Sequence, residues 1–520
     1  MKEQPVMQKT GMVTRRGVFQ AGALSAAGLL GGVASPAGAA GRPASAAVYE
    51  RIGVRPFINL TGAFTINGGM LTLPEVKQAM EEASHFSVHM DELMAAVGPR
   101  LAELLQCEAA IVTSGCSAAL THATSACVAG GDPELIQQLP DLTGLKDEVV
   151  LLHRYTYDHA IRTLGVKLTA VTTREEFLNA LSHRTAMVAL TAHGASGRAF
   201  PLEEIVAAAH EQDIPVLVDA AASYPRSPDP YLARGADLVT YSGGKLYRGP
   251  QCTGFLFGRK DLVDAAWLNS SPHHSFGRAM KVGKEEVMGA LAAVEACFAR
   301  RGLDKEVAMW SDWLGRIARR IEQVPGVSTK MVARPPASDH SYLDVSWDRT
   351  KIGYTAGELH DVLFMGEPRL QTMASGEGNR FPLRVTNIEE DQVSIVAERL
   401  YEVFHAAPRS KELRRAAPAA DLTGRWDAEL TFVRGSSTHE FYFEADGNRL
   451  AGTHHGRNAQ AGLRGFIDGG RVEFASRIRY QGSNLNYAFQ GSLRGDTISG
   501  EVRLGEYGPA TWSARRHKPA

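Results

Sequence analysis

A lysine on a glycine-rich turn is the residue of this sequence whose surroundings most clearly suggest chemistry. Lys245 lies in YSGGKLYRGPQ, between a glycine pair and a Gly-Pro, directly after the apolar run ADLVTYS. An acidic residue, Asp219, ends an earlier apolar run, IPVLVD. In an open α/β sheet the carboxyl ends of the strands border the ligand crevice. We therefore expect the amine of Lys245 and the carboxylate of Asp219 to face one pocket.

A third polar segment precedes both residues. In AAIVTSGCSAALTHATSACVAG, a short apolar strand is expected to turn through Ser114, Gly115, Cys116 and Ser117 into an alanine-rich helix. The free N–H groups at such a helix start suit a phosphate, although a plain helix cap uses the same residue types. Together the three segments suit a ligand that has a phosphate, an aldehyde that can react with the amine, and a group that binds a carboxylate. Pyridoxal 5'-phosphate (PLP) meets all three requirements.

Two kinds of pattern define the elements that must position these side chains. From residue 48 to 407, helical patterns such as PLEEIVAAAHEQ alternate with short apolar runs, which predicts a mainly parallel sheet flanked by helices. Residues 408–420, rich in Pro, Ala and charge, indicate a linker. Residues 421–516 alternate apolar and polar positions between Asp-Gly and Gly-Asn turns. That alternation predicts a small antiparallel β-barrel of lipocalin-like size, or a sandwich.

The first forty residues differ from the rest of the chain. Arg15 and Arg16 form a twin arginine, followed by an Ala/Gly-rich, weakly apolar run and the small-residue stretch at 37–40. This order is typical of a twin-arginine export signal at residues 1–40, and the run is too short and too rich in glycine for a membrane span. We expect a periplasmic or secreted protein that crosses the membrane folded, with its cofactor loaded.

Composition limits the remaining classes. A chain of 520 residues with 44% hydrophobic and 22% charged residues is expected to form several globular domains. A net charge of −1 lacks the basic excess of a nucleic-acid-binding protein. The five cysteines are scattered, without CxxC spacing or the density of a disulfide-stapled domain, so we expect most of them to be core residues.

The segment from Tyr49 to about Val403 resembles a family of fold-type I PLP enzymes. That family contains L-seryl-tRNA(Sec) selenium transferase and proteins of the D-glucosaminate-6-phosphate ammonia-lyase type. The matching stretches include YERIGVRPFINLTGAFTINGGMLTLPEVKQAM, VTSGCSAAL, YDHAIRTLG, VDAAASYP, DLVTYSGGKLYRGPQCTGFLFGRKDLV and GRAMKVGKEE. INGGMLTLPEV and GRAMKVGKEE are closer to the ammonia-lyase branch. The resemblance covers some two-thirds of the chain and implies the fold-type I architecture.

The resemblance also implies roles for individual residues. Lys245 would carry the cofactor aldehyde and later shuttle the proton at the substrate α-carbon, while Asp219 would keep the pyridine nitrogen protonated. Ala221 would pack on one face of the ring. His153 would stack on the other face, with Tyr157 or His159 as alternatives. The phosphate would be held by the following residues: Ser114, Gly115, Cys116, Ser117 and Ser242.

The substrate contacts are less sharply defined by the sequence. Arg278, Lys281 and Lys284 in GRAMKVGKEE form a cationic cluster that suits a substrate carboxylate or phosphate, or a solvated helix start. Arg384 in FPLRVTN is a second candidate for the carboxylate. The adjacent pairs at 273–274 and 454–455 are histidines, but no spaced third ligand accompanies them, so we predict no metal site.

We therefore expect a PLP-dependent enzyme acting at the α-carbon of an amino acid or amino sugar acid. A lyase that eliminates water or ammonia is the favoured reaction, with racemase, aldolase and transferase chemistry as alternatives. A non-catalytic exported binding protein is a further alternative, which Lys245 and Asp219 disfavour because mere binding requires neither. Fold-type I enzymes commonly place the active site at a subunit interface, so the resemblance implies a homodimer or higher homo-oligomer with the GPQCTG loop near the partner's cofactor.

Overall fold

The structure is a computed structural model that describes residues 46–192, 200–300, 302–333, 340–408 and 415–518. The predicted export signal at 1–40 lies outside the described residues. The chain divides into two compact units, one up to Pro56 and one from Phe57 onward, and the first contributes helix α1 (Ala47–Glu50). Among the described residues, no helix combines the length and apolar character that crossing a bilayer requires.

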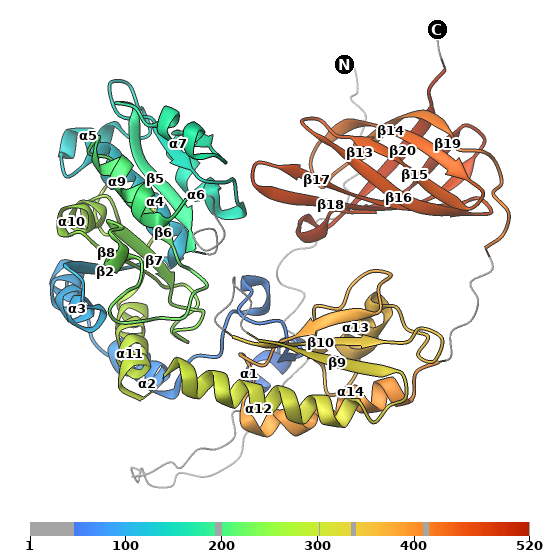
Figure 1. Ribbon diagram of the computed structural model, residues 1–520, viewed down its shortest axis with the longest axis horizontal. Helices are drawn as coiled ribbons and strands as arrows, with labels where there is room; N and C mark the ends of the chain where they lie inside the picture. Colours follow the sequence, from blue (N-terminus) through green and yellow to red (C-terminus); the bar gives the residue numbers. More distant parts are fainter. Residues whose placement is uncertain (1–45, 193–199, 301, 334–339, 409–414, 519–520) are drawn as a thin grey trace, which may run out of the picture. The chain divides into compact units, whose positions relative to one another are not determined.

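A seven-stranded sheet forms the centre of the larger α/β region, in the order β2-β8-β7-β6-β5-β3-β4 (Figure 1). Strand β8 runs antiparallel to both of its neighbours, and the other pairs are parallel. The strands are β2 (Ala109–Thr113), β3 (Glu148–Leu151), β4 (Lys167–Ala170), β5 (Thr185–Thr191), β6 (Val216–Asp219), β7 (Leu238–Ser242) and β8 (Gly254–Gly258). The predicted, mainly parallel sheet is therefore confirmed.

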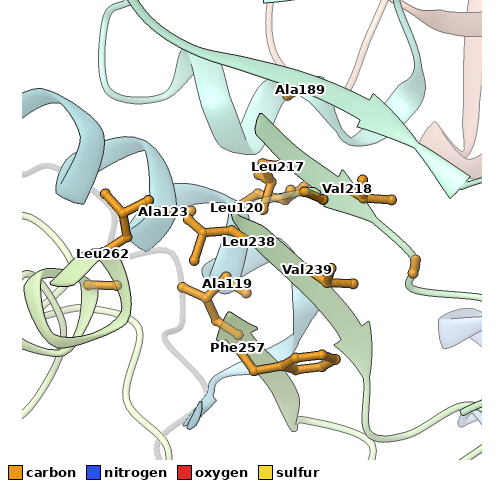
Figure 2. Packing of buried hydrophobic residues seen from close by; sticks show 14 of the residues in the cluster. Ala119, Leu120, Ala123, Ala189, Leu217, Val218, Leu238, Val239, Phe257 and Leu262 are labelled. Atoms are coloured by element: carbon orange, nitrogen blue, oxygen red, sulfur yellow. The ribbon is translucent and has the colours of Figure 1, made fainter. Parts of the chain in front are cut away.

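Helix α4 (Gly115–Ala129) follows β2 and packs against the sheet. Its alanine-rich sequence leaves nearly every side chain buried, and small side chains let the helix approach the strands closely. Figure 2 shows Ala119, Leu120 and Ala123 of α4 among Leu217 of β6 and Leu238 of β7. The other helices of this region are α2 (Pro74–Ser84), α3 (Met90–Leu105), α5 (Pro133–Gln138), α6 (His159–Arg162), α7 (Arg174–Ala180), α9 (Leu202–His210), α10 (Lys260–Leu268) and α11 (Lys284–Arg300).

A smaller α+β part follows in the sequence and has its own hydrophobic core. Its antiparallel sheet has the order β12-β10-β9. A short parallel pair joins β1 to β11, so Asn59 lies opposite Gln371 across more than three hundred residues of sequence. The elements are β1 (Ile58–Asn59), β9 (Val327–Val332), β10 (Tyr342–Trp347), β11 (Leu370–Gln371), β12 (Arg380–Leu383), α12 (Leu303–Ile321), α13 (Ala356–Met365) and α14 (Glu390–His405).

The last eight strands form a closed antiparallel barrel in sequence order, with β20 paired to β13. Side chains alternate between interior and solvent along each strand, as the sequence pattern predicted. Of the two predicted architectures, barrel and sandwich, the structure shows the barrel. Its strands are β13 (Gly424–Thr431), β14 (Ser436–Asp446), β15 (Arg449–His455), β16 (Gln460–Asp468), β17 (Arg471–Tyr480), β18 (Ser483–Arg494), β19 (Thr497–Arg503) and β20 (Pro509–Arg516).

Candidate active site

Three neighbouring elements bring the predicted cofactor-binding residues to one edge of the large sheet. Asp219 is the last residue of β6, Ser242 is the last residue of β7, and Lys245 follows three positions later. Gly115, Cys116 and Ser117 form the first turn of α4, next to these strand ends. The topology thus brings the acid, the amine and the helix start to the same edge of the sheet.

Asp219 is almost fully buried, with 8% of its surface exposed. Its Oδ1 accepts the backbone N–H of Ala221 at 3.1 Å and lies 3.6 Å from the Cys116 thiol. Burial raises the pKa of Asp219, and that N–H and the positive charge of Lys245 oppose the rise. The carboxylate is thus oriented by donors on one oxygen and needs a further positive group, which a protonated pyridine nitrogen supplies.

The glycine pair before Lys245 is explained by close packing. A side-chain carbon on Gly244 would lie 2.5 Å from the Cα of Gln251, so the turn accepts only glycine there without shifting the backbone. The turn that carries Lys245 therefore packs closely against the 250–253 loop. The Lys245 amine forms no hydrogen bond or ion pair within the described parts of the chain, and it lies 5.9 Å from the centre of the Tyr157 ring.

The start of α4 has the geometry of an anion cradle. Gly115 adopts a φ of +83°, a conformation that L side chains rarely adopt, and a carbon built on it would meet no atom within 4 Å. The first-turn N–H groups of a helix have no acceptor within that helix. Open space in front of free N–H groups is what a phosphate requires.

Of the three residues considered for stacking on the cofactor ring, Tyr157 is the one in the described lining of the Lys245 cavity, with its ring centre 5.9 Å from the Lys245 amine. His153 lies 3.4 Å from the Thr191 hydroxyl, with its ring tilted against Tyr155 at 5.8 Å. His159 bonds the carbonyl of Thr156 within its own turn. The sequence analysis missed Tyr155, a buried phenol whose pKa is raised well above its ordinary value by burial and by the nearby Asp219 carboxyl.

A cavity of about 400 Å³ opens beside Lys245. Its lining combines the loop between β1 and α2 with residues of the smaller α+β part, including Arg384 and Thr386. The loop is fixed by Asn59, whose side chain accepts the N–H and hydroxyl of Thr61 at 2.9 and 2.7 Å. The cavity is lined by Thr61, Gly62, Ala63, Phe64, Thr65, Met70, Tyr157, Ala222, Lys245, Leu246, His340, Arg384 and Thr386.

Arg384, like Lys245, lines this cavity without a carboxylate partner among the described residues. Its guanidinium lies 5.4 Å from the centre of the Tyr342 ring, and burial lowers its pKa. A buried guanidinium remains charged and favours a planar, two-oxygen partner. Its position facing the Lys245 cavity therefore suits the carboxylate of an amino acid.

The second predicted cationic cluster does not line the cavity of the same chain. Arg278 bonds the Ser271 hydroxyl at 3.2 Å, and the amine of Lys284 bonds the carbonyl of Ala83 at 3.1 Å. Lys281 is exposed. The structure therefore separates the sequence candidates: Arg384 lies with Lys245, and the 278–284 cluster does not.

The residues present fit PLP. The open helix start at 115–117 suits the phosphate, the unpaired Lys245 amine suits the aldehyde, and the buried Asp219 carboxylate suits the ring nitrogen. When bound, PLP withdraws electrons from the α-carbon of an attached amino acid. Such a site on a mainly parallel sheet defines a PLP-dependent enzyme of fold type I.

Comparison with known proteins agrees with this class. The Aminotransferase class-V family model matches residues 75–281. A 5'-C-glycyluridine monooxygenase-decarboxylase from a Streptomyces species is 32% identical over 62% of this chain and 83% of that protein. The D-glucosaminate-6-phosphate ammonia lyase of Salmonella typhimurium is 27% identical over 69% of this chain and 99% of that protein.

The solved structure of a D-glucosaminate-6-phosphate ammonia-lyase matches with a TM-score of 0.62 and 26% identity, over 69% of this chain and 98% of that structure. The chain belongs to the PLP-dependent fold-type I family that includes these relatives. The predicted fold type, the cofactor and the enzyme class are thereby confirmed, whereas the roles of individual residues remain predictions.

Proposed function

We propose that the protein is a PLP-dependent lyase that acts at the α-carbon of an amino acid carrying a hydroxylated carbon chain, such as an amino sugar acid. This proposal rests on one observation: Arg384 and Lys245 line the same cavity. Arg384 holds the substrate carboxylate, which directs the α-carbon toward the lysine. The Lys245 amine removes the α-proton and returns a proton to the leaving group.

The cavity edge supports a hydroxylated substrate. Thr65 and Thr386 contribute hydroxyl groups beside the apolar Phe64 and Leu246. Hydroxyl groups that line a cavity both donate and accept hydrogen bonds, which suits a polyhydroxylated chain. Both relatives named above act, by their names, on an amino acid attached to a sugar skeleton.

The deciding experiment measures the release of ammonia and of a 2-keto acid from D-glucosaminate and from its 6-phosphate. We expect release with the PLP-loaded protein and none with Lys245→Ala. Because Lys245 and Arg384 are the lysine and arginine in the described lining, we expect the unphosphorylated acid to be processed at least as well as the phosphate ester. Exchange of the α-proton with D2O but no ammonia release would indicate a racemase instead. Absence of both exchange and ammonia release would contradict the proposal.

A second candidate reaction is oxidative decarboxylation, favoured by the 32% identity to the glycyluridine enzyme. The same residues would hold the carboxylate and the α-carbon, but molecular oxygen would be consumed. An oxygen electrode separates the two reactions: uptake of oxygen with carbon dioxide release from a glycyl substrate would favour this candidate over the lyase.

We further propose that the enzyme is a homodimer. Large apolar side chains near the cavity loop are exposed, including Ile66 (90%) and Phe86 (69%), and such exposure is typical of subunit interfaces. The resemblance to fold-type I enzymes would place the 249–254 loop near the partner's cofactor. Sedimentation velocity of the PLP-loaded protein tests this: a fully active monomer at micromolar concentration would contradict it.

We also propose export through the twin-arginine route, on the basis of Arg15 and Arg16. Replacing both arginines by lysine should leave the protein in the cytoplasm. Fractionation of cells that express this double variant, beside the unaltered protein, measures the outcome. Periplasmic accumulation of the variant would show that the arginine pair is incidental.

A further inference from the structure

The barrel interior is filled at one end by aromatic side chains. Phe474 and Phe489 stack with ring centres 4.5 Å apart, and Trp512 meets Phe489 edge-on at 5.1 Å. Phe441 and Phe443 pack against the same group. An eight-stranded barrel has room either for packed side chains or for one small ligand. In this barrel a packed aromatic and aliphatic core shares the interior with a cavity at one end.

Next to these aromatic side chains lie three buried polar side chains, which are joined by hydrogen bonds. The Nδ1 of His439 lies 2.7 Å from the Nε2 of His454, and the Nδ1 of His454 lies 2.6 Å from the Ser476 hydroxyl. Their exposed fractions are 5%, 0% and 7%, respectively. Burial lowers the pKa of His454 to about 3 and lowers that of His439 as well. Both rings are therefore neutral at pH 7.

The chain of hydrogen bonds ends at one ring nitrogen of His439. Its Nε2 has no hydrogen-bond partner among the described residues, although only 5% of the surface of His439 is exposed. If the Ser476 hydroxyl donates toward His454, each following ring donates onward and His439 Nε2 carries a proton. In the opposite direction that nitrogen accepts. The relay therefore presents one hydrogen-bonding group to whatever lies in front of His439.

A cavity of about 350 Å³ lies in front of this nitrogen, at the barrel end formed by the β13–β14, β15–β16 and β17–β18 connections. This volume falls within the range of small-molecule sites. Its walls combine aromatic and aliphatic side chains with backbone of the three connections. The lining consists of Phe432, Arg434, Gly435, Ser436, Ser437, His439, Gly456, Arg457, Asn458, Ala459, Ile478, Tyr480, Leu485 and Tyr487.

The charge of the lining is one-sided. Its charged residues are two arginines, Arg434 and Arg457. The adjoining cavity, which shares His439 and Arg457, adds Asp427 and Glu440, but both of these carboxylates pair with Arg425. Neither Arg434 nor Arg457 forms an ion pair or side-chain hydrogen bond within the part of the chain that the structure describes. Both are exposed at the rim, whereas the floor is formed by His439, Ile478 and Tyr487. A ligand that satisfies all of these groups has an anion at one end and an apolar body with a polar atom at the other.

We propose that the barrel cavity binds a small aromatic carboxylate. Arg434 and Arg457 hold the carboxylate at the rim, and the aromatic body lies against Phe432, Ile478 and Tyr487. A hydroxyl or ring nitrogen on that body meets His439 Nε2, and the His454–Ser476 relay adapts its direction to donor or acceptor. This site is separate from the PLP cavity, shares no lining residue with it, and does not depend on the proposed lyase reaction.

Calorimetric titration of the PLP-loaded full-length protein tests this site with two probes, naphthalene-2-carboxylate and its 6-hydroxy derivative. We expect one binding site per chain and tighter binding of the hydroxylated probe. Arg434→Gln combined with Arg457→Gln should weaken both probes about tenfold or more, because charge-assisted hydrogen bonds are lost. His439→Phe should remove the preference for the hydroxylated probe. Arg494→Gln, at the opposite barrel end, should leave binding unchanged.

Several outcomes would overturn the proposal. Equal affinity for the uncharged naphthalene-2-carboxamide, or unchanged affinity in the double arginine variant, would show unspecific apolar binding. Loss of binding in Lys245→Ala would place the probe in the PLP cavity instead. No heat of binding at 25 °C and at 10 °C up to the solubility of both probes would also refute the site. The arginine variants alter exposed side chains only, so folding of the barrel is not at stake in them.

Discussion

The Lys245 cavity and the cavity at the end of the barrel have similar volumes, about 400 and 350 Å³, but opposite chemical characters. Beside the open sheet, an amine and a guanidinium without carboxylate partners among the described residues line one cavity, near a buried carboxylate. In the barrel, the buried polar groups are neutral imidazoles and a hydroxyl joined by hydrogen bonds, with one ring nitrogen left over. An open sheet exposes its strand ends, so charged groups can meet a substrate there, whereas a closed barrel buries what lies within. We therefore propose that the first cavity reacts with its substrate and that the second only binds a ligand.

The largest effect that tests this contrast is loss of the Lys245 amine. Lys245→Ala should abolish the yellow colour of the PLP-loaded protein and lower the rate of substrate breakdown by roughly 10³-fold or more. Visible absorbance measures the colour, and an assay of product release measures the rate. Borohydride labelling should mark Lys245 in the unaltered protein. Lys260→Ala, an exposed lysine that pairs with Asp264, is the matched control and should behave like the unaltered protein. A yellow, active Lys245→Ala protein would refute the assignment.

A smaller effect is expected from Asp219→Asn. The amide keeps an oxygen for the Ala221 N–H but loses the negative charge that holds the ring nitrogen protonated. We expect PLP to be retained and the turnover number to fall by about 10²-fold. Asp261→Asn, exposed on α10, serves as control. An unchanged turnover number in Asp219→Asn would show that the carboxylate has only a structural role.

Arg384→Gln should act on substrate binding rather than on the cofactor. We expect KM to rise by about ten- to hundredfold with the PLP absorbance unchanged, since a charged hydrogen-bonding partner of the carboxylate is lost. Arg434→Gln in the barrel changes the same residue type at the other cavity and should leave KM as it was. A normal KM in Arg384→Gln would instead favour the 278–284 cluster as the carboxylate site.

The sequence was most informative where chemistry coincides with local pattern. Asp219, Lys245 and residues 114–117 were identified because each follows an apolar strand, and parallel strands end at one edge. Thr61 and Thr386 were missed because only tertiary pairing, such as that of β1 with β11, brings them to the site. Tyr155 lies between two residues that were considered, His153 and Tyr157, but nothing in the sequence marks its hydroxyl as the one near Asp219. No local signal marks a threonine that lies opposite a lysine nearly two hundred residues away.

The barrel shows the same limit. Its strands were predicted from the alternation of apolar and polar residues, since that period is two. The hydrogen bond between His439 and His454 was not, because it depends on the register of β14 with β15, in which Phe441 lies opposite His454. In the sequence, His454 stood out only for its neighbour His455, which faces the other side of the strand.

Protonation of the barrel histidines should affect stability alone. The pKa of His454 is lowered from an ordinary 6.5 to about 3 in the folded state, so below pH 6.5 the unfolded chain binds more protons. This contribution to stability is fully present above pH 6.5 and is lost as pH falls toward 3. For each proton that only the unfolded chain binds, the free energy of unfolding falls by about 1.4 kcal/mol per pH unit.

His454→Phe removes this titration. The variant should be less stable than the unaltered protein by about 1–3 kcal/mol at pH 7.5, because two buried hydrogen-bonding partners are orphaned. The difference should narrow at pH 5. Urea-dependent cleavage of barrel peptides by a protease, quantified by mass spectrometry, follows the barrel specifically, and His455→Gln is the neighbouring control. A difference that stays constant from pH 7.5 to 5 would contradict a neutral, buried His454.

The smallest effect is expected from removing the barrel. Its hydrophobic core draws on residues from Leu422 to Ala514 only, and the two cores of the α/β region contain none of them. The described lining of the Lys245 cavity likewise includes no residue beyond Thr386. A chain ending at residue 420 should therefore keep its PLP absorbance and its α-proton exchange, while losing affinity for the naphthoate probes. If that shortened protein is soluble but colourless, the barrel contributes to the active site, and the contrast between a reacting cavity and a binding cavity does not hold.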